Sequence, residues 1–260
     1  MNIKAIFFDI DGTLLDSRTH KINDSTIEAF KLLKKKDIKL FIASGRSYNM
    51  LHDSKIPLEY FDGYICNNGA SIYDKDFNLL KATYIDRKKI FSLLELANKE
   101  NITLTFETID DVFNVNEPNQ YLMEAYDYFK CDHIPIKEYT NQNILMAVAY
   151  NDMSYDWNKF ANMCDLNALP GASTHCDLAN KGVSKHTGIV SMLDLHNIYS
   201  DEYMCFGDQM NDYDMLKNCS HPVIVLDDKS SKYLKDNFKN HALMQSEDGI
   251  YKYLKSINII

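Results

Sequence analysis

Two aspartates separated by one residue, Asp9 and Asp11, have side chains and a spacing that could serve nucleophilic and acid–base catalysis. They follow Ala5–Phe8, an apolar run without polar alternation that predicts a strand buried in a parallel sheet. Residues i and i+2 of a strand point the same way, so both carboxylates can share a site at its carboxyl end, where open α/β sheets bind ligands. Gly12 permits a turn that exposes backbone amides to an anion. This pattern suggests a nucleophile, a proton carrier and a phosphate-binding turn.

Other polar residues follow two further predicted strands, and a lysine begins a predicted helix. We expect these groups at the same sheet edge as the aspartates, because the carboxyl ends of parallel strands meet there. Carboxylates a few ångströms apart raise one another's pKa, and a divalent cation would relieve their repulsion. Oxygen ligands without His or Cys favour Mg²⁺, which commonly has a phosphate partner. The residues are Ser44, Gly45, Lys185, Asp208, Asn211 and Asp212.

The composition narrows the class of protein. The 260 residues carry 28 basic and 37 acidic side chains, a net charge of −9 that argues against a nucleic-acid partner. The six cysteines show no Cys-x-x-Cys spacing, which favours reduced thiols in a cytoplasmic protein. The chain opens without a signal segment and has no apolar run near the about 20 residues that span a bilayer. We therefore expect a monomer with no membrane partner.

The order of predicted elements indicates the domain organisation. Residues 1–83 and 181–260 alternate strands and helices, which predicts a parallel sheet with helices on both faces. Residues 84–180 instead predict two or more helices and several strands with hairpin turns. The expected fold class is α/β, a doubly wound parallel, Rossmann-like core with an inserted α+β domain.

Several local patterns make predictions about single elements. Ser25 and Glu28 have the spacing of a capping box that opens a helix. Asn68-Gly69 is a hairpin signal. We expect the hairpin arms to be Ser71–Tyr73 and Leu79–Tyr84. A second set of predictions comprises a helix from Ser184 to about His196 with Ile189, Val190 and Leu193 inward, a helix at Asp156–Cys164 and a strand at Ala172–Leu178.

The chemical motifs, taken together, resemble the four motifs of the haloacid dehalogenase superfamily. The order of elements is similar to its Cof-like sugar-phosphate phosphatases, whose α/β cap is inserted between the second and third motifs. The similarity covers nearly the whole chain and includes Asn67-Asn68-Gly69-Ala70 and Glu247-Asp248-Gly249. The four motifs are Asp9-Ile-Asp11-Gly-Thr-Leu, Ser44-Gly-Arg, Lys185 and Gly207-Asp208-x-x-Asn211-Asp212.

The resemblance implies a Mg²⁺-dependent phosphatase for small phosphorylated metabolites. Asp9 would attack phosphorus and form an aspartyl-phosphate, and Asp11 would act as general acid and base. The implied Mg²⁺ ligands are Asp9, the backbone carbonyl of Asp11 and Asp208, with Asp212 in support. The implied phosphate-binding residues are Gly12, Ser44, Gly45, Lys185 and Asn211.

Three positions require a choice or depart from the family pattern. Lys181 lies four residues before Lys185, but only Lys185 has the Ser-Lys context at a helix start, so we assign the phosphate-binding lysine there. Gln209 replaces a usually small residue and could narrow the site. Val225-Leu226-Asp227-Asp228 stands where the family commonly has Met-Gly-Asn-Ala, and the lost glycine and extra carboxylate could alter substrate preference or metal support.

Other interpretations of the same residues stay open. The Asp-x-Asp-Gly pattern is not an EF-hand, because its glycine is at position four and His20 is at position twelve. Arg46 could reach substrate, although an ion pair is the stronger expectation, and His186 could line the substrate pocket. Alternative functions are a phosphosugar mutase, and a non-catalytic ligand-binding regulator on the same fold.

Overall fold

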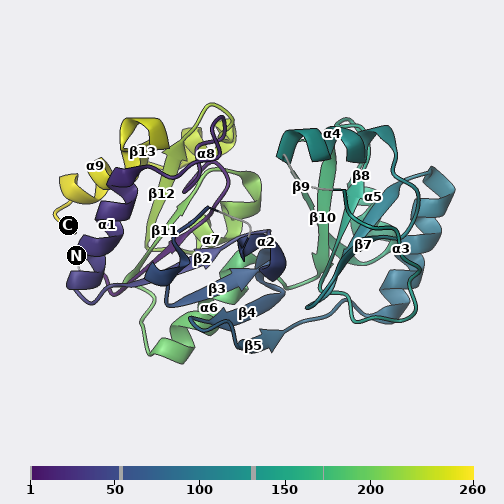
Figure 1. Cartoon of the computed structure of the whole chain (residues 1–260), viewed down its shortest axis with the longest axis horizontal. Helices are drawn as coiled ribbons and strands as arrows, with labels where there is room; N and C mark the ends of the chain where they lie inside the picture. Colours follow the sequence, from purple (N-terminus) through teal and green to yellow (C-terminus); the bar gives the residue numbers. More distant parts are fainter. Residues whose placement is uncertain (1, 53–54, 130–132, 172) are drawn as a thin grey trace. The chain divides into compact units, whose positions relative to one another are not determined.

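The structure is a computed structural model that describes residues 2–52, 55–129, 133–171 and 173–260. The chain forms two compact units, which Figure 1 shows in sequence colours. The core unit comprises Met1–Arg46, Met50–Lys81 and Ser184–Ile260, and the inserted unit comprises Ser47–Asn49 and Ala82–Val183.

The core unit contains an eight-stranded sheet in which β13 through β3 run parallel. β4 pairs antiparallel with β3, and β5 forms the edge beside β4. Strand β1 is therefore central, with two parallel neighbours, so its carboxyl end lies between those of β11 and β2. In spatial order the strands are β13 (His241–Leu243), β12 (His221–Leu226), β11 (Tyr203–Gly207), β1 (Ala5–Phe8), β2 (Lys39–Ala43), β3 (Gly63–Cys66), β4 (Ser71–Asp74) and β5 (Leu79–Ala82).

Helices cover both faces of this sheet, because successive residues of its buried strands point to opposite sides. Phe8 packs edge-on against Phe30 of α1, on the side that α9 also covers. Phe7 belongs to the apolar cluster on the other side, to which α6, α7 and α8 contribute. The helices are α1 (Asp24–Lys35), α2 (Tyr48–His52), α6 (Lys185–His196), α7 (Tyr213–Lys217), α8 (Lys232–Asn237) and α9 (Gly249–Ser256).

The inserted unit contains a five-stranded antiparallel sheet. Residues of α3 and α5 pack in one apolar cluster with alternate sheet residues such as Leu104 and Phe106. Leu122 and Ala125 of α4 pack against Val148 and Tyr150, in a separate cluster. In spatial order the strands are β7 (Val112–Asn114), β6 (Thr103–Glu107), β8 (Met146–Tyr150), β10 (His175–Asn180) and β9 (Leu166–Pro170), and the helices are α3 (Arg87–Glu100), α4 (Gln120–Phe129) and α5 (Asn158–Met163).

The predicted fold class is confirmed, but some local predictions are wrong. Helix α1 begins at Asp24 with Asn23 as N-cap and no side-chain capping bond, so Ser25 and Glu28 form no capping box. The Asn23 side chain instead donates to the backbone oxygen of Gln245, 222 residues away. A tertiary hydrogen bond has therefore displaced the local capping pattern.

The hairpin turn joins a different pair of strands from the pair predicted. Asn67–Gly69 forms a 3₁₀ turn between β3 and β4, and β4 and β5 are neighbours through a later connection. Asn67 and Asn68 both have positive φ, 52° and 51°, a conformation that asparagine tolerates better than most residues. The sequence signal identified a real turn, but it did not show which strands the turn joins.

Two further predictions fail because burial depends on neighbouring elements. Val190 is 41% exposed, and Met192 is buried in its place beside Ile189 and Leu193. Strand β9 was not predicted; after the buried Leu166 its residues are partly buried and the last, Pro170, is exposed, so they show no clear alternation. The strand predicted at 172–178 is β10, which begins at His175, and residue 172 lies outside the described residues.

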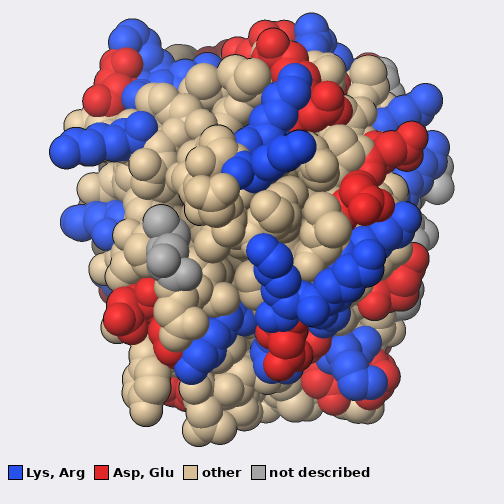
Figure 2. Space-filling view, turned by 90° about the vertical axis from the view of Figure 1, so that its left-hand side faces the viewer, with Lys and Arg blue, Asp and Glu red and all other residues tan. Residues whose placement is uncertain are grey.

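The side of the molecule drawn in Figure 2 carries charges of both signs. Figure 2 shows one side of the molecule, on which Lys and Arg are interspersed with Asp and Glu. Lys34, in the first basic run of the sequence, pairs with Asp62 at 2.7 Å. Among the described residues, no helix combines the length and apolarity needed to cross a membrane.

Candidate active site

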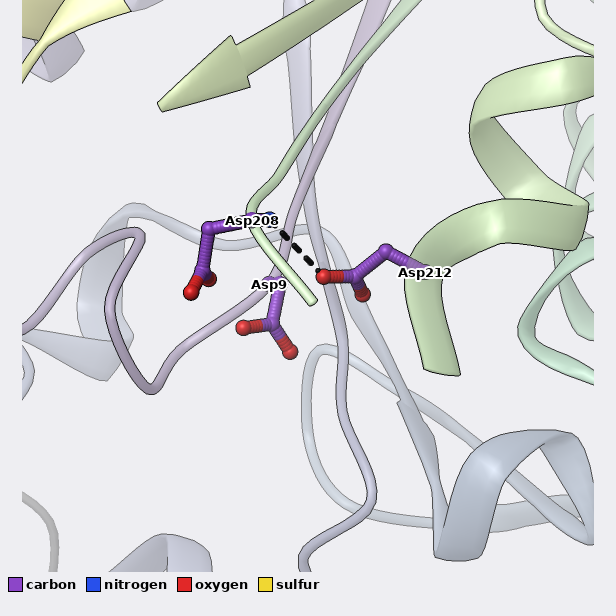
Figure 3. Close-up of side chains that lie close together, drawn as sticks. All are labelled: Asp9, Asp208 and Asp212. Atoms are coloured by element: carbon purple, nitrogen blue, oxygen red, sulfur yellow. Dashed lines mark hydrogen bonds between the residues drawn. The ribbon is translucent and has the colours of Figure 1, made fainter. Parts of the chain in front are cut away.

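Three buried aspartates converge at the carboxyl end of β1. Asp9 follows β1, Asp208 follows β11, and Asp212 ends the 3₁₀ turn Met210–Asp212 (η3). One carboxylate oxygen from each lies within 4.8 Å of the other two, and Figure 3 shows the side chains around a common space. We call these residues the aspartate cluster. The parallel register of β1 and β11 brings together residues that are far apart in sequence.

Lys185, the first residue of α6, is bonded to two members of the aspartate cluster. Its Nζ lies 2.5 Å from Asp9 Oδ1 and 2.6 Å from Asp212 Oδ1, and its side chain is fully buried. The Ser184 hydroxyl caps α6 by accepting from the Thr187 N–H, which fixes where the helix begins. The cap thereby places the lysine at the cluster.

The electrostatics of the aspartate cluster favour a bound cation. Burial and the neighbouring charge of Asp212 raise the pKa of Asp9 from 3.8 to about 7, although Lys185 acts in the opposite direction. Burial and the charge of Asp9 also raise the pKa of Asp208 well above its usual range. Although burial opposes its charge, Asp212 and Asp9 hold the pKa of Lys185 above its ordinary value.

The donor set is suited to magnesium. If all three carboxylates are ionised, Lys185 leaves a formal charge of −2 in a buried site. Each carboxylate offers a hard oxygen ligand, and Mg²⁺ is a hard cation that prefers such ligands. A divalent cation would replace the protons that the raised pKa values imply. The residues present therefore fit Mg²⁺.

Asp11 does not point into the aspartate cluster. Arg46 donates to both of its oxygens, from Nη2 at 2.6 Å and Nε at 2.8 Å. Asp11 is 39% exposed, so its carboxylate remains reachable from solvent. The expected ion pair of Arg46 is confirmed, but its partner was not predicted. The two residues follow neighbouring strands β1 and β2, which is the signal that could have indicated it. As a metal ligand, Asp11 would use its backbone carbonyl.

Gly12 and Thr13 shape the space beside Asp208. Gly12 has φ +87°, and a Cβ there would lie 2.4 Å from Asp208 Oδ2. The Thr13 hydroxyl donates to Asp208 Oδ1 at 2.9 Å. The Gly12 N–H donates to the Leu15 oxygen at 2.9 Å, so that amide is not directed at a phosphate in this structure. Gly12 provides room for the Asp208 carboxylate, and phosphate binding by the Gly12 region stays a prediction. Thr13 was not predicted to contact the cluster.

Ser44 and Gly45 form the loop after β2, and the Asn67–Gly69 turn supports that loop. The Asn68 N–H donates to the Ser44 oxygen, and the Asn67 N–H donates to the Arg46 oxygen, both at 3.0 Å. The Ser44 hydroxyl is buried and accepts from the Arg46 N–H at 3.1 Å. The β3–β4 turn therefore holds Ser44 and Arg46 in place.

Asn211 and Gln209 flank the aspartate cluster from the loop after β11. Asn211 Oδ1 is buried without a hydrogen-bond partner, which is unusual for a polar atom and fits a ligand-binding role. The N–H groups of Asp208 and Gln209 donate to Asp212 Oδ2 at 2.9 and 3.0 Å. Gln209 Nε2 donates to the Lys229 oxygen at 2.5 Å, so its side chain holds a neighbouring loop.

The remaining departures lie away from the cluster. Lys181 is exposed and pairs with Asp165 in the inserted unit, so Lys185 is the lysine at the aspartate cluster. Asp227 is buried and accepts from the Ser17 hydroxyl, and it is not in the aspartate cluster. Asp228 is exposed and pairs with Arg18 at 3.4 Å.

Comparison with known proteins agrees with this geometry. The family described as haloacid dehalogenase-like hydrolase matches residues 6–254. A candidate phosphatase of Mycoplasma genitalium is 26% identical over 284 aligned residues, which cover 98% of this chain and 98% of that protein.

Two solved structures share the fold along almost the whole chain. One is a phosphatase of the haloalkanoate superfamily from Bacteroides thetaiotaomicron, 26% identical with a TM-score of 0.88, covering 99% of this chain and 96% of that one. The other is a subclass IIB sugar phosphatase, 26% identical with a TM-score of 0.86, covering 99% of this chain and 100% of that one.

Proposed function

Because this chain belongs to the haloacid dehalogenase-like hydrolases and is a phosphatase, we propose that it hydrolyses small phosphorylated metabolites with Asp9 as nucleophile. The observation that carries the proposal is the buried aspartate cluster bonded to Lys185, with Asp11 two residues from Asp9. The resemblance to the superfamily predicted from the motifs is confirmed. The residue roles that follow are our proposal.

The first step transfers the phosphoryl group to the protein. An Asp9 oxygen forms a bond to phosphorus while the bond from phosphorus to the substrate oxygen breaks. Asp11 donates a proton to the departing alkoxide, which leaves as an alcohol. Lys185, Ser44 and Asn211 hold the phosphoryl oxygens. The positive charge of Lys185, already bonded to Asp9, reduces the repulsion between the carboxylate and a phosphate dianion.

The second step restores Asp9. Asp11, now ionised, takes a proton from water as the water oxygen attacks phosphorus, and the bond between phosphorus and Asp9 breaks. Inorganic phosphate then leaves. Mg²⁺ held by Asp9, Asp208 and the Asp11 carbonyl, with Asp212 in support, would neutralise phosphoryl charge. Arg46 holds the ionised Asp11 carboxylate through bonds to both oxygens, and one of these bonds must open when Asp11 carries the proton, because a protonated carboxyl oxygen donates rather than accepts.

Sugar phosphates are the substrate class that we propose within the small phosphorylated metabolites. The support is the 26% identity to a subclass IIB sugar phosphatase over essentially the whole chain. We further propose that the inserted segment, predicted at 84–180, selects the substrate. The boundaries of that segment and its role remain predictions.

A phosphate-release assay tests the proposal. Wild-type protein with Mg²⁺ should hydrolyse an aryl phosphate and, faster, one or more sugar phosphates from a panel ranked by kcat/KM. Asp9→Asn keeps the size of the side chain but removes the nucleophile, so its rate should fall by about 10³-fold or more. Melting temperatures would show that both proteins are folded. Equal rates in the two proteins would refute the role of Asp9, and product isomers without released phosphate would indicate a mutase.

A further inference from the structure

A buried glutamine from the end of the chain holds the loop that follows β1. Gln245 is 2% exposed and begins the 3₁₀ turn Gln245–Glu247 (η4), which precedes α9. Its Nε2 donates to the Thr13 backbone oxygen at 2.6 Å, and its Oε1 accepts from the Thr26 hydroxyl at 2.8 Å. The Asn23 side chain donates to its backbone oxygen. Gln245 is therefore bonded to Thr13 within the loop between β1 and α1, to Asn23 at the end of that loop, and to Thr26 in the first turn of α1.

The bond to Thr13 extends to the aspartate cluster. The Thr13 hydroxyl donates to Asp208 Oδ1 at 2.9 Å, and both residues are buried. The Thr13 N–H makes only a long bond, 3.3 Å to the Ile10 oxygen, so the 2.6 Å bond from Gln245 is the shorter restraint on its backbone. Thr13 and the room left by Gly12 together determine how the Asp208 carboxylate is oriented.

We infer that Gln245 is a positioning residue for the magnesium site and acts through Thr13 on Asp208. This inference rests on the proposed function, because it assumes that the aspartate cluster holds Mg²⁺. Replacing a residue that orients a metal ligand through hydrogen bonds typically lowers metal affinity by about 10–100-fold. The side-chain hydrogen bonds of Gln245 go to Thr13 and Thr26, neither of which is a proposed metal ligand or phosphate-binding residue, so its loss should weaken magnesium binding without removing the chemistry.

Gln245→Met and Thr26→Val separate this role from a purely structural one. Methionine has a similar volume and removes both side-chain hydrogen bonds. Thr26→Val removes only the bond that Gln245 Oε1 accepts, and it keeps the bond that Nε2 donates to Thr13. Magnesium dissociation constants would be measured by calorimetry on chelator-treated full-length protein. Gln245→Met should bind Mg²⁺ about tenfold more weakly or worse, and Thr26→Val should stay within about twofold of wild type. Excess Mg²⁺ should restore most of the kcat of Gln245→Met.

The outcomes distinguish this inference from the function on which it rests. Equal magnesium affinity in Gln245→Met and Thr26→Val would overturn the role of Gln245. No magnesium binding by the wild type would instead overturn the proposed metal site. If Gln245→Met does not fold, Gln245→Asn provides the same test, because its shorter amide cannot hold Thr13 at 2.6 Å without moving the loop. A double variant with Thr13→Val should bind Mg²⁺ no more weakly than Thr13→Val alone.

Discussion

The two units bury polar groups in different ways. In the core unit, three carboxylates and one ammonium group gather at strand ends. In the inserted unit, a neutral network crosses the sheet: the Thr105 hydroxyl donates to Asn114 Oδ1 at 2.6 Å, and Asn114 Nδ2 donates to the Tyr126 hydroxyl and the Ile134 oxygen, both at 3.0 Å. The first arrangement leaves charge uncompensated, whereas the second pairs amide, hydroxyl and carbonyl groups with one another.

We relate the charged arrangement in the core unit to function and the neutral network in the inserted unit to stability. A buried polar network whose members are hydrogen-bonded fixes one packing arrangement and needs no ligand. A buried cluster with excess negative charge is unfavourable until a cation or protons compensate it. The raised pKa of Asp9 and of Asp208 is the sign of that excess. We therefore expect substitutions in the cluster to lower catalysis and metal binding as well as stability, and substitutions in the network to lower stability alone.

The largest effect is expected for Lys185→Met. It removes the cation bonded to Asp9 and Asp212, so the rate of phosphate release should fall by about 10³-fold or more. Breaking a buried pair also destabilises, on the order of 3–5 kcal/mol. Lys181→Met is the matched control, because that lysine makes an exposed ion pair with Asp165, which contributes little to stability. Similar rates of phosphate release by the two variants would contradict a specific role for Lys185.

An effect of intermediate size is expected from pH on metal-free protein. The pKa of Asp9 is about 7 in the folded protein and ordinarily 3.8, so the folded state binds more protons between these values. The resulting stabilisation is present below about pH 4 and is lost as pH rises through 7. Between pH 4 and 8, chelator-treated wild type should therefore become less stable relative to Asp9→Asn, by on the order of a few kcal/mol. Mg²⁺ should reverse that loss, and parallel pH profiles would contradict the charge excess.

The smallest effect is expected for Asn114→Leu in the inserted unit. It removes three hydrogen bonds and leaves buried partners unpaired, so the free energy of unfolding should fall by about 1–3 kcal/mol. Denaturant unfolding measures this change. The magnesium concentration for half-maximal activity should stay within about twofold of wild type, because the network belongs to the inserted unit and the aspartate cluster to the core unit. A large shift in that concentration would show that the network is not purely structural.

Much of the aspartate cluster could be predicted from the sequence because its residues lie at or near strand ends. Asp9, Asp208 and Asp212 were predicted from this position alone, since parallel strands bring such residues to one edge. The bonds of Asp11, by contrast, were not predicted. Its partner Arg46 was expected in an ion pair, but the pairing depends on which strands are neighbours.

Errors arose where a distant residue overrides a local signal. Ser25 and Glu28 have the spacing of a capping box, yet Asn23 caps α1 while its side chain bonds to Gln245. The side chain of Asn23 thus found a partner that the local pattern does not contain.

The sequence by itself determined the residue types and the order of elements: carboxylates after buried strands, a lysine at a helix start, and an insertion of different pattern between them. These are local properties, because strand and helix periodicity and turn residues are read within short windows. Only the tertiary structure decided that Gln245 reaches Thr13 across 232 positions, and that Thr13 in turn holds Asp208. Such contacts depend on how helices and loops pack over the sheet, and no short window of sequence contains that information.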